Sequence, residues 1–178
     1  MGETRLISIV GRKNAGKTTL VVAMAADFSR RGRKVGTIKH GMTPAQMDTE
    51  GTDTWRHYNE GNADRVLIEG PDQRIMIDRS QHEEGPVSLA ERYFTDCDIV
   101  IVEGFKRHDI PKIEVYRTGL TEPTVYSEAD DLKSNWIAVV TDLDDLQVPV
   151  PTFRFKDTAW LVSLTGLAWS SGKVLRQG

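Results

Sequence analysis

The chain has little of several things, and each shortage excludes a class of protein. A single cysteine, Cys97, stands among its 178 residues, which excludes an internal disulfide and is typical of a reducing compartment. No apolar run approaches the ~20 residues of a membrane-spanning helix, and the first residues lack an apolar secretory signal. The net charge is -3 at pH 7, which disfavours a general nucleic-acid binder. We expect a cytoplasmic protein that binds neither nucleic acid nor membranes.

The most informative segment that is present is Gly-Arg-Lys-Asn-Ala-Gly-Lys-Thr at 11–18, which matches the phosphate-binding pattern G-x-x-x-x-G-K-[ST]. An apolar run at 6–10 precedes it and predicts a buried strand. A helical pattern at about 17–31 follows, with Gly32 as its end signal. In this strand–loop–helix context, loop N–H groups and the helix N-terminus converge on one point that suits a polyphosphate.

The loop assigns roles to individual residues. Lys17 is expected to reach the β- and γ-phosphates, and the Thr18 hydroxyl is expected to bind Mg²⁺. Thr19 is placed to donate to the α-phosphate. The predicted nucleotide-binding residues of the loop are Gly11, Asn14, Ala15, Gly16, Lys17, Thr18 and Thr19.

The rest of the chain alternates strand and helix patterns. Strands are expected at 35–39, 98–102, 112–116, 136–140 and 152–155, and helices at 54–60, 87–94 and 158–167, the last capped by Asp157. Runs at 65–68 and 74–77 flank a Gly-Pro-Asp turn and predict a hairpin. We therefore predict an α/β, three-layer P-loop NTPase fold with a mostly parallel sheet flanked by helices. An antiparallel hairpin, at about 65–77, is expected at the sheet edge. The length and the lack of a linker predict one nucleotide-binding domain over residues 1–178.

Two carboxylates are candidates for chemistry beside the phosphates. Glu103 ends the most apolar strand pattern, and ligands of open α/β sheets lie at the carboxyl ends of strands. It could hold a Mg²⁺ water or orient an attacking water, while Gly104 could offer its N–H to the γ-phosphate. Asp48 lies in an irregular segment that could fold over the phosphates and complete the metal shell. Glu103 and Asp48 are the predicted catalytic pair and, with Thr18, the predicted metal site.

Two further features concern the base and a second ligand. Asp142 follows the 136–140 strand, where a carboxylate could accept from the two guanine N–H groups that adenine lacks. Since the full Asn-Lys-x-Asp signature is absent, guanine and adenine both remain open. Four basic residues stand at the same predicted rim and form a candidate second-ligand or partner site: Lys39, His40, Lys106 and Arg107.

Five segments stand in a fixed order along the chain: 11–19 (GRKNAGKTT), 36–40 (GTIKH), 48–57 (DTEGTDTWRH), 60–63 (EGNA) and 101–106 (IVEGFK). Together they resemble the molybdopterin-guanine dinucleotide biosynthesis adaptor protein (MobB) family, over about residues 5–165. Family members often carry several histidines after the second strand. Only His40 stands there in this chain, so no role of those histidines is carried over.

The resemblance implies a homodimeric GTP-binding protein with weak GTPase activity at most. Such a protein assists the attachment of GMP to molybdopterin, which gives the guanine dinucleotide form of the molybdenum cofactor. Its implied ligands are GTP and Mg²⁺. By the resemblance, Lys17 and Thr18 contact phosphate and metal, and Asp142 contacts guanine. Glu103-Gly104 corresponds to the second acidic motif of the family. The implied partner is the molybdopterin guanylyltransferase; molybdopterin and a molybdoenzyme chaperone are further candidates.

Alternatives remain at this point. The same loop serves small-molecule kinases, and it also serves scaffolds that use nucleotide only to set their dimer state. Some dimeric relatives carry a basic residue after the first loop glycine that reaches the other subunit's phosphates. Arg12 occupies that place and is a candidate for such a contact in trans, with a solvated arginine as the alternative.

Overall fold

The computed structural model describes residues 3–41, 48–80, 82–129 and 133–175. They belong to two compact units: residues 1–40 with 85–178, and residues 41–84. The first unit contains every predicted site residue except Asp48. A single nucleotide-binding domain over the whole chain stays a prediction.

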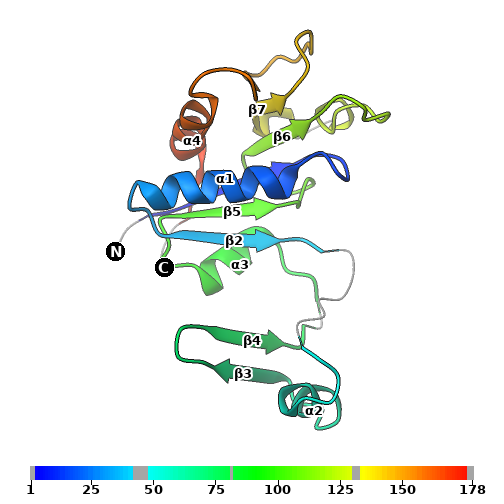
Figure 1. Cartoon of the computed structure of the whole chain (residues 1–178), viewed down its shortest axis with the longest axis vertical. Coiled ribbons are helices and arrows are strands. Elements are labelled where there is room, and N and C mark those ends of the chain that lie inside the picture. The colour runs from blue at the N-terminus through cyan, green and yellow to red at the C-terminus, as the bar shows by residue number, and fades with distance from the viewer. Residues whose placement is uncertain (1–2, 42–47, 81, 130–132, 176–178) are drawn as a thin grey trace. The chain divides into compact units, whose positions relative to one another are not determined.

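A seven-stranded sheet forms the centre of the first unit (Figure 1). Its strands are β1 Thr4–Val10, β2 Val35–Lys39, β5 Ile99–Glu103, β6 Lys112–Tyr116, β7 Trp136–Thr141, β8 Thr152–Arg154 and β9 Lys173–Leu175. The order β2-β5-β1-β6-β7-β8 is parallel throughout, and β9 pairs antiparallel with the start of β1. Parallel strands share one carboxyl edge, so the loops after β2, β5, β1, β6 and β7 open at the same side of the sheet.

Helices cover both faces of this sheet. α1 (Lys17–Arg30) and α4 (Trp160–Ser171) pack on one face, where Met24 and Leu164 join Ile101 of β5 in the largest core cluster. α3 (Pro86–Tyr93) covers the opposite face, where Ala90 packs with Val100 of β5. The first four residues of β5, from Ile99 to Val102, are therefore all buried, which explains its unbroken apolar run. The predicted three-layer fold is confirmed.

The α3-side face of β6 is polar although it is buried. Lys112 donates from Nζ to the carbonyls of His108 and Ile110 and lies over the Trp136 ring. Burial lowers the pKa of Lys112 to about 8. Glu114 accepts from the N–H groups of Val125 and Tyr126, at the start of the 3₁₀ helix η1 (Tyr126–Glu128), and from Trp136 Nε1. Burial raises the pKa of Glu114. These two charged residues hold loops onto the sheet.

The second unit contains α2 (Asp53–Asn59) and a two-stranded sheet of β3 (Arg65–Glu69) and β4 (Arg74–Asp78). The hairpin is confirmed, but its expected place at the edge of the main sheet is wrong: among the described residues β3 and β4 pair only with each other. Its own cross-strand ion pairs, Arg65–Asp78 and Arg74–Glu69, join its strands. The local sequence pattern determines the turn and the pairing of β3 with β4. It does not indicate whether a further strand pairs with the hairpin.

Most predicted elements lie within two residues of the observed bounds. The last helix is the exception, because it ends at Ser171, four residues beyond its expected end at 167. Its N-cap is Ala159, with φ +58°, so Asp157 is not the cap. The remaining 3₁₀ helix, η2 (Lys133–Asn135), and the three-residue strand β9 gave no sequence signal. Among the described residues, no helix is long and apolar enough to cross a bilayer.

Candidate nucleotide-binding site

The loop between β1 and α1 has the shape that its glycines predict. Gly11 adopts φ +144°, and a Cβ there would lie 2.4 Å from the carbonyl oxygen of Val115 in β6. Only glycine permits this approach of two backbones. Beyond it, Asn14 adopts a left-handed conformation with φ +62°, and the N–H of Ala15 donates to the Arg12 carbonyl at 3.2 Å. The loop is thereby folded back on itself at the head of α1.

Lys17 crosses this loop. Its Nζ donates to the Arg12 carbonyl at 2.7 Å, and burial lowers the pKa of Lys17, with Glu103 acting in the opposite direction. The first bond within α1 runs from the Leu20 N–H to the Gly16 carbonyl, so the preceding helical N–H groups have no partner inside the helix. A cation and the positive end of a helix therefore meet at one place, which favours an anion.

Thr18 and Glu103 are brought together as the sequence predicted. The Thr18 hydroxyl donates to Glu103 Oε2 at 2.8 Å, although the two residues are 85 positions apart. Register explains the meeting, because Glu103 is paired with Ile9 on β1, immediately before the loop. Its side chain is only 12% exposed. A hydroxyl and a carboxylate are the hard oxygen donors that Mg²⁺ prefers, so this pair fits the predicted metal.

Gly104 does not meet its expected role. Its N–H donates to the Ile9 carbonyl at 3.0 Å, and its carbonyl accepts from Ser8 Oγ at 2.6 Å. With φ +101°, the residue turns the chain back against β1 directly after β5. The N–H that was expected to face the γ-phosphate is thus used inside the sheet, and what Gly104 provides is the turn that orients Glu103.

Asp142 lies after β7, on the other side of β1 from Glu103 in the strand order. Its Oδ1 accepts from the N–H of Thr118 at 2.7 Å and from the Thr118 hydroxyl at 3.0 Å. The backbone bond from Thr118 is the main cause of a lowered pKa of Asp142. The carboxylate is therefore fixed and ionised, with Oδ2 as the oxygen that remains for a base.

Arg117, which no sequence motif indicates, also lies beside the phosphate loop. Its Nε lies 3.8 Å from Asp142 Oδ2, and its side-chain stem passes 3.8 Å from the point where Gly16 would carry a Cβ. The guanidinium thus stands between the phosphate loop and Asp142. Its position after β6 was the available signal, because ligands gather beyond the carboxyl ends of parallel strands.

Arg12 folds onto its own chain. Its Nε donates to the Pro123 carbonyl at 3.0 Å, and the guanidinium pairs with Glu128 and, at 3.9 Å, with Glu122. The bond to Glu128 is the main cause of a raised pKa of Arg12. A contact in trans would require these bonds to open, and that role stays a prediction.

Comparison with known proteins fits this geometry. Residues 6–142 match the family described as "Molybdopterin guanine dinucleotide synthesis protein B" (MobB). The chain belongs to the MobB family.

Individual relatives agree with this assignment. The chain is 36% identical over 122 residues to a molybdopterin-guanine dinucleotide biosynthesis adapter protein of Haemophilus influenzae, a match that covers 66% of each chain. The adapter protein of Escherichia coli is 27% identical over 152 residues, covering 80% of this chain and 87% of that protein. A crystal structure of molybdopterin-guanine biosynthesis protein B superposes with a TM-score of 0.69 and 28% identity, covering 93% of this chain and 98% of the other.

Asp48 belongs to the second unit. Its Oδ1 accepts from the Thr49 N–H and the Thr52 hydroxyl, each at 2.8 Å, and its Oδ2 accepts from Thr54. These bonds, above all that from Thr54, lower the pKa of Asp48 and organise the start of α2. The expected contact of Asp48 with the metal would join the two units, and it stays a prediction.

The basic rim begins with Lys39, at the end of β2. Phe105, buried and left-handed with φ +54°, packs its ring against His40 at 4.5 Å and His108 at 5.0 Å. Lys106 and Arg107 are exposed on the turn between these rings. The rings fix the turn that carries the two charges, and a second ligand there stays a prediction.

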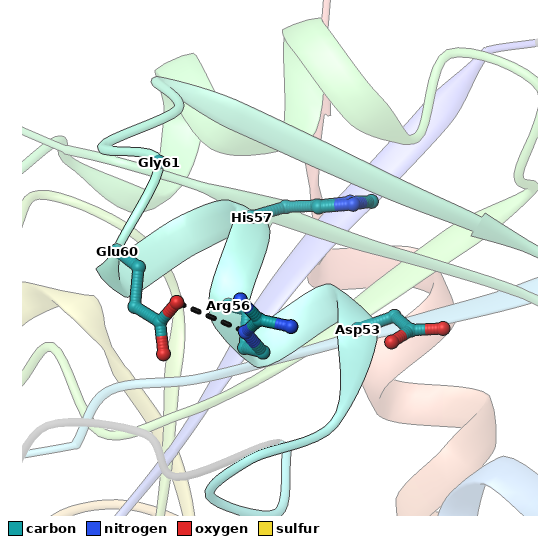
Figure 2. A pocket seen from close by; sticks show the side chains of 5 residues that line it. All are labelled: Asp53, Arg56, His57, Glu60 and Gly61. Carbon is teal, nitrogen blue, oxygen red and sulfur yellow. Dashed lines mark hydrogen bonds and ion pairs between the residues drawn. The ribbon is translucent and has the colours of Figure 1, made fainter.

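A hollow of about 400 Å³ lies on α2, lined by Asp53, Arg56, His57, Glu60 and Gly61 (Figure 2). Arg56 is engaged there by Glu60 at 2.9 Å, while the His57 ring points away from that pair. In the described part of the chain, no group of three or more His, Cys, Asp or Glu side chains could hold a metal ion.

Proposed function

We propose that this protein is a GTP-binding accessory protein of molybdenum cofactor synthesis, which assists the attachment of GMP to molybdopterin and hydrolyses GTP weakly. One observation carries the nucleotide part: the Thr18 hydroxyl and the Glu103 carboxylate are joined at 2.8 Å, beside Lys17, at the head of α1. Membership of the MobB family supports the biosynthetic part.

Each residue has a chemical task in this proposal. The loop N–H groups and Lys17 bind the β- and γ-phosphates, and Lys17 exchanges the Arg12 carbonyl for phosphate oxygens. Thr18 and Glu103 would hold Mg²⁺, the latter through a water, and the metal would neutralise charge on the phosphates. Glu103 can also orient the attacking water. Asp48 would join this shell if its segment folds over the phosphates.

Hydrolysis should be slow, because the described residues around the loop include no glutamine and the loop's own arginine is already paired. Arg12 is tied to Glu128 and Pro123. Unassisted P-loop GTPases turn over on the order of 10⁻⁴ to 10⁻² per second, and we expect the isolated protein in this range. A turnover of several per second would favour a self-sufficient enzyme over an accessory protein.

The proposed partners follow the family. They are a second copy of the chain, the molybdopterin guanylyltransferase, and molybdopterin or a molybdoenzyme chaperone, acting in the cytoplasm. If Arg12 reaches a second subunit, nucleotide affinity should rise with protein concentration in the wild type and not in Arg12→Ala. An unchanged concentration dependence in the variant removes the contact in trans.

A reconstituted reaction tests the proposal. Guanylyltransferase, molybdopterin and Mg·GTP are combined with wild type, Lys17→Ala or Lys34→Ala, and formation of the guanine dinucleotide is measured. Lys34 precedes β2 at the opposite edge of the sheet, where it pairs with Asp96, and so serves as the matched control. Wild type and Lys34→Ala should raise the yield and Lys17→Ala should not. Equal yields with all three, or phosphate transfer to a small acceptor, would contradict the proposal.

A further inference from the structure

Lys39 lies closer to the phosphate site than its place on the rim suggests. In the parallel pairing of β2 with β5 it stands directly beside Glu103. Its Nζ is 3.6 Å from Glu103 Oε1, while Oε2 of the same carboxylate accepts from Thr18. Lys39 thus belongs to the cluster of Lys17, Thr18 and Glu103.

The strand order gives the proposed nucleotide a direction. The phosphate loop follows β1. Arg117 and Asp142 follow β6 and β7 on one side of it, and Glu103 and Lys39 are the last residues of β5 and β2 on the other. Neighbouring strands are about 4.8 Å apart. A nucleotide whose base lies at Asp142 therefore runs its phosphate chain across β1 towards β5 and β2, and its terminal phosphate comes last.

The ion pair of Lys39 is one that can be exchanged. At 3.6 Å it is longer than a hydrogen bond, and the Lys39 side chain is 66% exposed, whereas Glu103 is 12% exposed. The backbone of Lys39 is nevertheless fixed, because the next residue, His40, donates its N–H to the Glu103 carbonyl at 2.9 Å. If Glu103 turned towards a metal-bound water, it would give up part of its attraction for Lys39, and the Lys39 ammonium would then be drawn to the nearest anion.

From this arrangement we propose that Lys39 binds the terminal phosphate of a nucleoside triphosphate and gives the site its preference for triphosphate over diphosphate. The inference rests on the nucleotide site of the proposed function. It assigns a second lysine to the phosphates, supplied by β2 rather than by the loop. A diphosphate ends short of this lysine, so its affinity does not depend on Lys39.

Calorimetric titration with Mg²⁺ and either GDP or a non-hydrolysable GTP analogue tests this role. Lys39→Met should weaken binding of the analogue by about tenfold or more, the loss of one charge-assisted hydrogen bond, and leave GDP within about twofold. Lys39→Arg should retain most of the preference. Lys34→Met, at the other end of β2, should change neither affinity. Circular dichroism and a urea titration establish that each variant is folded.

The outcomes separate the possible failures. If folded wild type binds neither nucleotide, the proposed nucleotide site is wrong and the inference falls with it. If wild type binds both and Lys39→Met keeps the same ratio of affinities, the site stands and Lys39 is not its terminal-phosphate contact. Adding Lys39→Met to a Glu103→Gln variant gives the last distinction. If Lys39 contacts the phosphate directly, the double variant binds the analogue more weakly than Glu103→Gln alone. If Lys39 only holds Glu103, the two variants bind the analogue equally.

Discussion

Two pairs of lysine and glutamate on the same sheet have opposite surroundings. Lys112 and Glu114 of β6 are both fully buried. Lys39 of β2 is largely exposed, and Glu103 is the last residue of β5, at the carboxyl edge of the sheet. The same residue types thus serve loop attachment in one place and, by our proposal, ligand binding in the other.

The partners of each pair account for this difference. Glu114 is held by two backbone N–H groups and the Trp136 indole, and Lys112 by two backbone carbonyls. These partners belong to packed chain segments and cannot leave without local unfolding. Glu103 is held by the side chains of Thr18 and Lys39, which can each turn to another partner. A charged residue is available for a ligand when its partners can exchange.

The largest effect should come from truncating the two glutamates. Glu114→Ala leaves three donors without their acceptor, two of them in buried hydrogen bonds, and should lower the free energy of unfolding by about 3 kcal/mol. Glu103→Ala should lower it by about 1 kcal/mol or less. Urea titrations of both variants and the wild type measure this. Equal losses would remove the distinction between the two pairs.

The next effect concerns pH. Because the pKa of Lys112 is lowered to about 8 in the folded protein, against about 10.5 in the unfolded chain, the unfolded state holds more protons between these values. The contribution of Lys112 to the free energy of unfolding should therefore rise from pH 8 to pH 10, by about 2 kcal/mol. Comparing wild type with Lys112→Met across this range cancels other titrating groups. Parallel pH profiles would show that Lys112 does not titrate there.

A smaller effect should separate binding from stability at the site. Thr18→Ala removes one metal donor and should weaken GTP binding in Mg²⁺ about tenfold, while GTP binding in EDTA and the free energy of unfolding stay nearly unchanged. Isothermal calorimetry with and without Mg²⁺, beside a urea titration, provides the measurement. An equal loss of affinity with and without the metal would mean that Thr18 does not act through Mg²⁺.

The smallest effect should be at the base. Asp142→Asn keeps an oxygen for Thr118 but turns the other acceptor into a donor, so GTP affinity should fall about fivefold, a loss of about 1 kcal/mol. Affinity for xanthosine triphosphate should rise. Competition titrations with GTP, ATP and xanthosine triphosphate measure the preference. If GTP affinity does not change, another residue, with Arg117 as the nearest candidate, reads the base.

Much of the site was predictable because its parts lie in local patterns. The loop, the strand before it and α1 are continuous in the sequence, and an acidic residue at the end of an unbroken apolar strand indicated Glu103. The hairpin followed from its turn, and the helices from their periodicity. Parallel strands, each ending at one edge, then brought Thr18 and Glu103 together.

What could not be predicted depends on which strands are neighbours. β2 lies beside β5, about 60 residues later in the chain, so the Lys39–Glu103 pair has no local signal. The turn that uses the Gly104 N–H within the sheet depends on β1 in the same way. The separate sheet of β3 and β4, and the short strand β9, are likewise results of tertiary pairing that residue preferences do not encode.

Titration of GTP and Mg²⁺ into wild type, Lys17→Ala and Lys34→Ala, each confirmed as folded, tests the central proposal most directly. We predict saturable binding to wild type and to Lys34→Ala, and an affinity at least about a hundredfold lower for Lys17→Ala, the loss of about 2.7 kcal/mol that a partly buried cation facing phosphate should cause. Wild-type protein that takes up no purine nucleotide, or a Lys17→Ala variant that binds GTP as tightly as wild type, would contradict the account.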